Sequence, residues 1–227
     1  MNKKLCDAVC DRDLPLVKQL LAEGASPNTV DPSSGMSLLC IACECKKGDV
    51  ARALLEAGAE PSASALQTAV AHECLGAVMA LIKGGADVGG RDETGTTPLH
   101  NAVRPERHQG DGWRSVDPHI PRWLVFRGGA DIEARNRRGR TPLHDAARGL
   151  DPEVLYDLIE WGADTGARDR DGRTPLHIAV VHGRAHNLRP LLREGRARDN
   201  SGDTPLALAK RLGHVKCEQE LLRTGPV

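Results

Sequence analysis

Cysteine, histidine and arginine are the side chains of this sequence whose types and spacing could support chemistry. The cysteines include a Cys-x2-Cys-x-Cys string that starts at Cys40, with two more at Cys6 and Cys10. Cysteine thiolates bind zinc, but a structural zinc site needs a second ligand pair at a usable distance, and none follows this string. The spacing therefore predicts no metal site, and small buried residues are the simpler interpretation.

Histidine recurs in one fixed context, the string Thr-Pro-Leu-His. This string occupies residues 97–100, 141–144 and 174–177, and Thr-Pro-Leu-Ala follows at 204–207, so the starts are 44, 33 and 30 residues apart. The sequence contains no phosphate-binding Gly-x-x-x-x-Gly-Lys loop, no Gly-x-Ser-x-Gly elbow and no His-Glu-x-x-His motif. No enzyme class is indicated, and no cofactor is predicted.

Composition argues against several classes of protein. The 227 residues carry 31 Lys+Arg and 31 Asp+Glu, so the formal net charge is zero, whereas generic nucleic-acid binding needs a large basic excess. No run of 18 apolar residues could span a membrane, and residues 1–13 lack the apolar region of a signal peptide. Seven cysteines without regular spacing fit reduced thiols. We expect a cytoplasmic or nuclear monomer that binds neither nucleic acid nor membrane.

A repeat of about 33 residues organises the sequence. If Thr is position 1, Leu at position 3, Ala at position 6 and Gly at position 22 recur in copies that start near residues 3, 37, 64, 97, 141, 174 and 204. Thr is a good N-cap, and Pro next to it needs no hydrogen-bond donor. Apolar pairs at positions 18 and 19 give a second helix its buried face, and Gly ends that helix. Each copy therefore predicts two helices and a loop.

These strings, with Gly-Ala-Asp at 85–87, 129–131 and 162–164, resemble the ankyrin-repeat family over essentially the whole chain. The resemblance implies an all-α fold, a solenoid of stacked helix–turn–helix units with hairpin-like loops, forming a single domain over residues 1–227. It also implies that His100, His144 and His177 are structural and bond the backbone of a neighbouring loop.

The resemblance further implies that a protein partner meets the loop tips and positions 5, 8 and 9 of each copy, which lie on its first helix. The residues of this chain at such positions are Asn101, Arg104, Arg137, Arg138, Arg140, Asp145, Arg148, Arg170, Arg173, Ile178 and His182. Arginine dominates this set, and two interpretations stay open. The arginines are either a solvated charged face or a groove for an acidic or phosphorylated segment, since arginine offers bidentate donors. The leading hypothesis is a non-enzymatic interaction module or adaptor.

Three departures interrupt the repeat. The loop before residue 64 is six residues short, and the loop before residue 204 is three short. About 11 extra residues lie within 104–121, between the two expected helices of one copy, and include Trp113. This insert is either a tolerated surface loop or a contact loop anchored by Trp113. The alternative function is a small-molecule-binding protein or enzyme, with a groove pocket under the insert and with Asp145 and His182 as acid and base.

Overall fold

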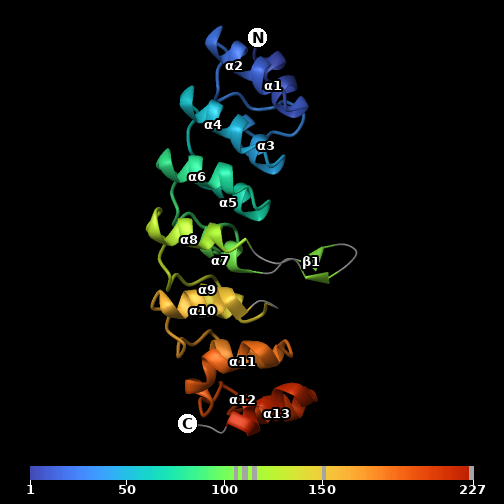
Figure 1. Cartoon of the computed structure of the whole chain (residues 1–227), viewed down its shortest axis with the longest axis vertical. Coiled ribbons are helices and arrows are strands. Elements are labelled where there is room, and N and C mark those ends of the chain that lie inside the picture. Colours follow the sequence, from blue (N-terminus) through green and yellow to red (C-terminus); the bar gives the residue numbers. More distant parts are fainter. Residues whose placement is uncertain (105–106, 109–111, 114–116, 150–151, 225–227) are drawn as a thin grey trace. The chain divides into compact units, whose positions relative to one another are not determined.

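A computed structural model describes residues 1–104, 107–108, 112–113, 117–149 and 152–224, and only the backbone of residues 107–108 and 112–113. Helices follow one another in pairs along the chain (Figure 1). The pairs are α1 (Asn2–Asp11) and α2 (Leu14–Ala22), α3 (Leu38–Glu44) and α4 (Gly48–Glu56), α5 (Ala63–Ala71) and α6 (Leu75–Lys83), α7 (Pro98–Val103) and α8 (His119–Phe126), α9 (Pro142–Ala146) and α10 (Pro152–Glu160), and α12 (Pro205–Leu212) and α13 (Val215–Thr224). Helix α11 (Pro175–Val181) is followed by two 3₁₀ segments, η1 (Ala185–Asn187) and η2 (Arg189–Glu194).

The chain divides into two compact units. Unit 1 comprises Met1–Asp92 and His119–Ala130, and unit 2 comprises Glu93–Pro118 and Asp131–Val227. In unit 1 the first helices pack in the order α1, α3, α5, and the second helices in the order α2, α4, α6, α8. In unit 2 the first helices pack in the order α7, α9, α11, α12. Within each unit, like helices of successive copies are therefore neighbours, as in a solenoid. No helix of the described residues is long and apolar enough to cross a membrane.

The Thr-Pro-Leu-His strings start helices and also tie successive layers of unit 2 together. The backbone N–H of Thr141 donates to Nδ1 of His144 at 3.2 Å, and Pro142 fills the first helical position. His144 Nε2 donates to the carbonyl oxygen of Arg173 at 3.0 Å, directly before the next helix start. His100 makes the same bond to Arg140 at 2.9 Å, and His177 to Asp203 at 3.2 Å. The three histidines thus have the structural role that the family resemblance implied.

The short loop before residue 64 changes where helix α5 begins. The N-cap is Ser62, whose hydroxyl accepts from the N–H of Ala65 at 3.1 Å, two residues before the start expected at 64. Packing beyond the short loop stays close, because a Cβ on Gly48 of α4 would lie only 2.8 Å from the Cα of Gly76 of α6. The shorter loop is therefore accommodated by a shift in where α5 begins, and α4 and α6 remain in close contact.

The second helical segment after α11 is not α-helical, although the apolar pair Leu191 and Leu192 predicted a second helix there. Two 3₁₀ segments meet at Leu188, and Pro190 is the second residue of η2. Proline has no N–H to donate, and its ring clashes with the carbonyl four residues earlier, so one continuous α-helix cannot run through it. Leu191 is fully buried, whereas Leu192 is partly exposed.

The insert lies between α7 and α8, in the copy where it was expected. Within it, strands β1 (Arg107–His108) and β2 (Gly112–Trp113) pair antiparallel, a two-residue ladder in an otherwise helical fold. Residues 119–121, which the sequence placed at the end of the insert, form the first turn of α8. The side chain of Trp113 and the glycine at position 225 lie outside the described residues.

The repeated leucine and alanine positions form the core. Leucines at position 3 are at most 2% exposed at Leu5, Leu39, Leu66, Leu99, Leu143 and Leu176. The alanines at position 6 are all buried: Ala8, Ala42, Ala69, Ala102, Ala146, Ala179 and Ala209. Small side chains at position 6 let neighbouring helices approach closely. The positions that recur in the sequence are therefore the positions that pack between the helices.

Replacing Leu143 by Ala should destabilise the protein by about 2–5 kcal/mol, because truncating a fully buried leucine loses transfer free energy and leaves a cavity. Denaturant unfolding of the full chain measures this loss. The matched control is Leu222→Ala, since Leu222 is 57% exposed, and its unfolding midpoint should stay close to that of the wild type. Equal midpoints for Leu143→Ala and the wild type would mean that the repeat register is misassigned.

Candidate functional site

All of the site residues predicted from the sequence belong to unit 2, and many lie on its loops. The tip of each loop is held by one side chain. Asp169 Oδ1 accepts from the N–H groups of Asp171 and Arg173, at 3.0 and 2.9 Å, and Gly172 takes a left-handed φ of 71°. Asn136 and Asp199 hold the neighbouring loops in the same way. The tips are therefore ordered turns with a defined backbone.

Successive loops are also bonded to one another through their backbones. The N–H of Arg137 donates to Thr94 O at 3.0 Å, and that of Arg170 donates to Arg138 O at 3.0 Å. The N–H of Asn200 donates to Asp171 O at 2.9 Å. These bonds fix the spacing between neighbouring tips, so side chains on different loops present one continuous surface.

Two of the predicted contact arginines belong to the interior of this loop framework. Arg140 Nε lies 3.2 Å from Asp169 Oδ2, and the two side chains are only 10% and 1% exposed. Arg173 Nε lies 3.7 Å from Asp199 Oδ2, whose side chain is 1% exposed, and Arg173 also pairs with Asp171 at 3.4 Å. Arg140 therefore offers a partner almost no surface, which corrects its expected place at the loop tips, and Arg173 offers only part of its side chain.

A further set of arginines ties loops together and was not identified from the sequence. Arg135 Nη1 donates to Gly139 O at 3.0 Å in its own loop and to Arg168 O at 2.6 Å in the next. Arg168 Nη1 repeats both bonds, to Gly172 O at 3.2 Å and to Arg198 O at 2.7 Å. The signal was present in the sequence, because an arginine directly precedes the turn-forming Asn136, Asp169 and Asp199 in each loop.

Three predicted arginines remain exposed at the tips: Arg137, Arg138 and Arg170. We name these three residues the fingertip surface. The backbone bond from Arg170 to Arg138 holds two of them on adjacent loops at fixed separation. A rigid pair of guanidinium groups can bind carboxylates or phosphates without first losing backbone freedom.

The predicted helix residues are more buried than the sequence indicated. Ile178 is fully buried, so it packs in the core and offers no contact surface. Asp145 is 3% exposed, and its Oδ1 lies 3.7 Å from Nη1 of the half-buried Arg148. Asn101 and Arg104 are partly exposed. Burial, followed by the charges of Arg148 and Arg184, lowers the pKa of the partly exposed His182 to about 4.

The cysteines of the described residues are free thiols. Cys6, Cys40 and Cys43 are buried as expected, and burial raises the pKa of the Cys43 thiol far above its ordinary value. Cys10 of α1 is exposed, so its expected burial is corrected. Among the described residues, no group of three or more His, Cys, Asp or Glu side chains is arranged to hold a metal ion.

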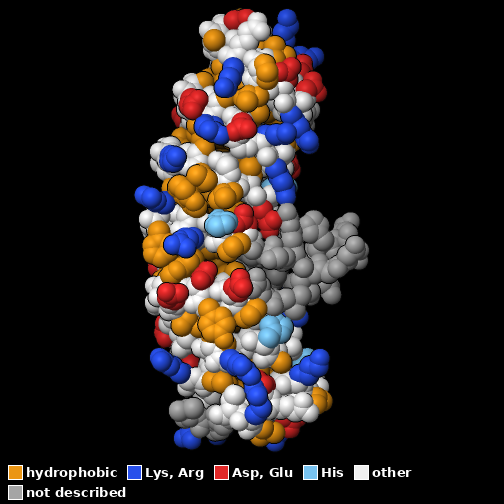
Figure 2. Space-filling view, in the orientation of Figure 1, with side chains coloured by type: hydrophobic (Ala, Val, Ile, Leu, Met, Phe, Trp, Pro, Cys, Tyr) orange, Lys and Arg blue, Asp and Glu red, His pale blue; other side chains and the backbone are white. Residues whose placement is uncertain are grey.

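In unit 1, hydrophobic side chains gather over the α6 and α8 helices (Figure 2). Phe126 is 60% exposed, and the Arg127 guanidinium lies 5.9 Å from the ring of Trp123. A cavity of about 460 Å³ beside α4 and α6 is lined in part by Leu55 and Met79. None of the residues that were predicted to bind a partner lies on this apolar face.

Comparison with known proteins agrees with the fold. A family model of ankyrin repeats matches in three copies, over residues 5–89, 113–196 and 146–226. The chain therefore belongs to the ankyrin-repeat family, whose repeats are in general protein–protein interaction modules. No curated protein matched the chain.

Two buried histidines, His144 and His177, and the partly exposed His182 should make the protein less stable in mild acid. Burial is the main cause that lowers the pKa of His144, His177 and His182 in the folded chain, while unfolded histidine keeps a pKa near 6.5. Below about pH 6.5 the unfolded state therefore binds more protons than the folded state, and the free energy of unfolding falls. For His182 this loss continues down to about pH 4.

Urea midpoints measured between pH 7.5 and 4.5 test this expectation. The midpoint should fall with pH, and His182→Gln should flatten the fall, whereas His186→Gln at an exposed position should not. A midpoint that does not change over this range would contradict the assigned burial of the histidines.

Substituting a buried loop arginine and an exposed one should have different effects on the stability of the protein. Arg140→Ala leaves the buried carboxylate of Asp169 without its guanidinium, which costs about 3–5 kcal/mol for buried pairs. Arg138→Ala removes an exposed side chain and should change stability by less than about 0.5 kcal/mol. Chemical denaturation compares both with the wild type, and similar midpoints for the two variants would show that Arg140 is not structural.

Proposed function

We propose that the chain is a non-enzymatic interaction module that binds an acidic segment of a partner protein along unit 2. The observation that carries the proposal is the fingertip surface, three exposed arginines on adjacent loops whose backbones are bonded to one another. Carboxylate and phosphate groups are the natural partners of fixed guanidinium groups, because each can accept two parallel N–H bonds. The segment would lie across the tips, from Arg137 to Arg170.

The helix face beside the tips extends the cationic surface. Arg104 and Arg148 are partly exposed on unit 2, at the end of α7 and just after α9. Asp145 offsets part of the Arg148 charge, so we assign the larger share of binding to the tips. An exposed cationic strip raises association rates with acidic partners, and this effect weakens as salt rises, because the screening length is about 8 Å at physiological ionic strength.

The enzymatic alternative gains no support from the residues that it needs. The carboxylate of Asp145 is buried beside Arg148. The pKa of His182 is about 4, which makes its imidazole a weak base at neutral pH. The insert expected to cap a pocket lies largely outside the described residues. We therefore assign binding, and no reaction, to this surface.

The proposal is tested with a fluorescent ten-residue oligoglutamate peptide as probe and an oligoglutamine peptide as its neutral control. Fluorescence anisotropy measures affinity at low and at high salt. The wild type should bind oligoglutamate more tightly, and Arg137→Glu, Arg138→Glu and Arg170→Glu together should reduce affinity at least tenfold at low salt. The melting temperature should stay close to that of the wild type, because these side chains are exposed.

The matched control changes charge by the same amount in unit 1. Lys46→Glu, Lys47→Glu and Lys83→Glu together replace three exposed lysines and should leave the peptide affinity nearly unchanged. Equal affinity of the wild type for the two peptides would refute an acidic partner. An equal loss in both triple variants would mean that net charge acts, rather than the fingertip surface.

A further inference from the structure

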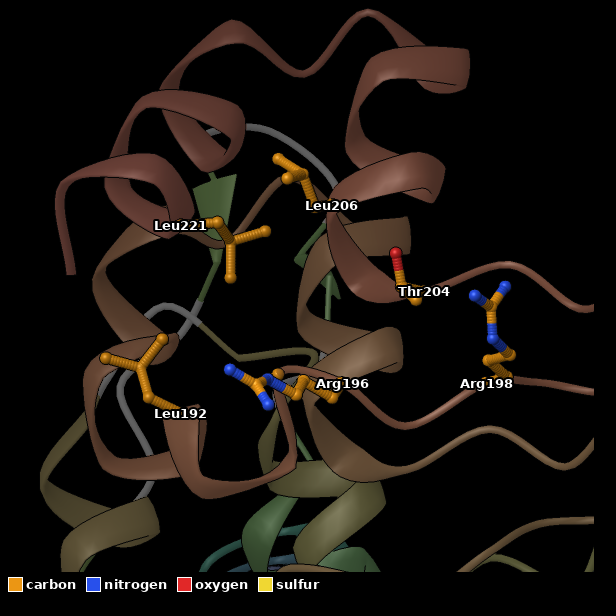
Figure 3. Close-up of a pocket in the computed structure, with 7 residues that line it drawn as sticks. Leu192, Arg196, Arg198, Thr204, Leu206 and Leu221 are labelled. Atoms are coloured by element: carbon orange, nitrogen blue, oxygen red, sulfur yellow. The ribbon is translucent and has the colours of Figure 1, made fainter. Parts of the chain in front are cut away.

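A second candidate site in unit 2 is a cavity of about 280 Å³ between η2 and the helices α12 and α13 (Figure 3). Leu192, Leu206 and Leu221 come from three different elements and extend toward the same space. Arg196, Arg198 and Thr204 complete most of the lining. The cavity therefore combines an apolar floor with one cationic side chain directed toward it, that of Arg196 (Figure 3).

The shortened loop before residue 204 explains why the cavity exists. When the turns at Asp169 and Asp199 are aligned, residues 163–165 of the earlier loop have no counterpart after Gly195. In that earlier loop Ala163 is 7% exposed, so it fills space inside the layer. Where this residue is missing, Leu206 is partly exposed, although the leucines at the same repeat position in the preceding layers are at most 2% exposed.

The shortened loop before residue 204 also makes room for an arginine side chain beside the cavity. Arg196 stands where the earlier loop has Gly166. A Cβ on Gly166 would lie 3.3 Å from both Asp164 Oδ1 and Glu194 Oε1, so a side chain there is hindered. Without a counterpart of Asp164, the loop accommodates the exposed side chain of Arg196.

Arg198 ends the series of arginines that bond two loops. Arg168 donates both to Gly172 O in its own loop and to Arg198 O in the next. In the described part of the chain, Arg198 Nη1 repeats only the first of these bonds, to Gly202 O at 2.8 Å. The Arg198 guanidinium is therefore held at its own loop tip, and in Figure 3 it points away from the three leucines.

From these observations we propose that the cavity binds a small organic anion, an aromatic carboxylate whose ring lies on the three leucines and whose carboxylate meets Arg196, the arginine that Figure 3 shows directed toward them. An enclosed apolar cavity of about 150 Å³ can hold benzene, so 280 Å³ has room for one ring and a short acidic arm. Charge-assisted bonds from arginine would orient the anion. The site is separate from the fingertip surface and does not depend on the function proposed there.

The test uses three probes on the isotopically labelled full chain: phenylacetate, its neutral analogue phenylacetamide, and acetate. Amide chemical shifts recorded during titration give both the position of binding and the dissociation constant. Phenylacetate should shift the amides of Leu192, Arg196 and Leu206 saturably. Phenylacetamide should bind at least fivefold more weakly, and acetate should not saturate.

Variants separate the charge from the apolar floor. Arg196→Gln should weaken phenylacetate to the affinity of phenylacetamide. Arg198→Gln, whose side chain points away from the leucines, and Arg193→Gln, an exposed arginine of η2, should have little effect. Leu206→Phe should fill the cavity and weaken both aromatic probes. Melting temperatures and spectra of the unliganded variants identify any that misfold, and if Arg196→Gln is among them, Arg196→Ala provides the comparison.

Three results would overturn the proposal. They are the absence of saturable shifts with phenylacetate, equal affinity for the acid and the amide, and unchanged affinity for phenylacetate after Arg196→Gln. Binding of a peptide Asp-Phe-Asp without binding of phenylacetate would likewise overturn it, because the cavity would then be part of a protein interface.

Discussion

Successive layers of unit 2 are joined by hydrogen bonds from histidines. Each histidine lies in the first turn of one helix and donates to a backbone carbonyl in the loop that precedes the next first helix. His100, His144 and His177 receive a backbone N–H on Nδ1 and donate from Nε2 to a carbonyl oxygen about one repeat further along. Both ring nitrogens are used, which fixes the neutral tautomer and the ring orientation. The loops are then placed closely enough for their own backbones to bond, so the surface at their tips follows from these imidazoles.

This framework also explains why arginines of similar position have different roles. Arg138 and Arg140 lie on either side of Gly139, yet Arg138 is exposed, whereas Arg140 is buried beside Asp169. Asp169 uses one carboxylate oxygen to hold its own turn and the other to accept Arg140, so the same side chain orders one loop and joins it to another. The arginines of the fingertip surface carry their charges on loop backbone that hydrogen bonds already order. We infer binding capacity from this combination, and not from the number of arginines.

The repeat made much of the fold predictable from the sequence. Leucine at position 3 and alanine at position 6 recur at fixed spacing, and they are the residues that pack between helices. The site was less predictable, because the partners of its side chains lie about 30 residues away. The burial of Arg140 depends on Asp169, and the pair formed by Arg173 depends on Asp199. Pro190 was the one sequence signal for the 3₁₀ segments after α11. The cavity could be predicted only from the residues that the loop before residue 204 lacks.

Bonds between layers fix the loop tips of unit 2 relative to one another. Hydrogen–deuterium exchange of the amides of Arg170 and Asn200 tests this claim, because these amides donate to Arg138 O and Asp171 O on the preceding loops. If the layers are fastened as described, both amides should exchange at least 100-fold more slowly than in an unstructured chain, although the side chains of these residues are exposed. Exchange of both amides at the rate of an unstructured chain, while the core amides of α11 stay protected, would show that the tips move independently and would contradict the claim.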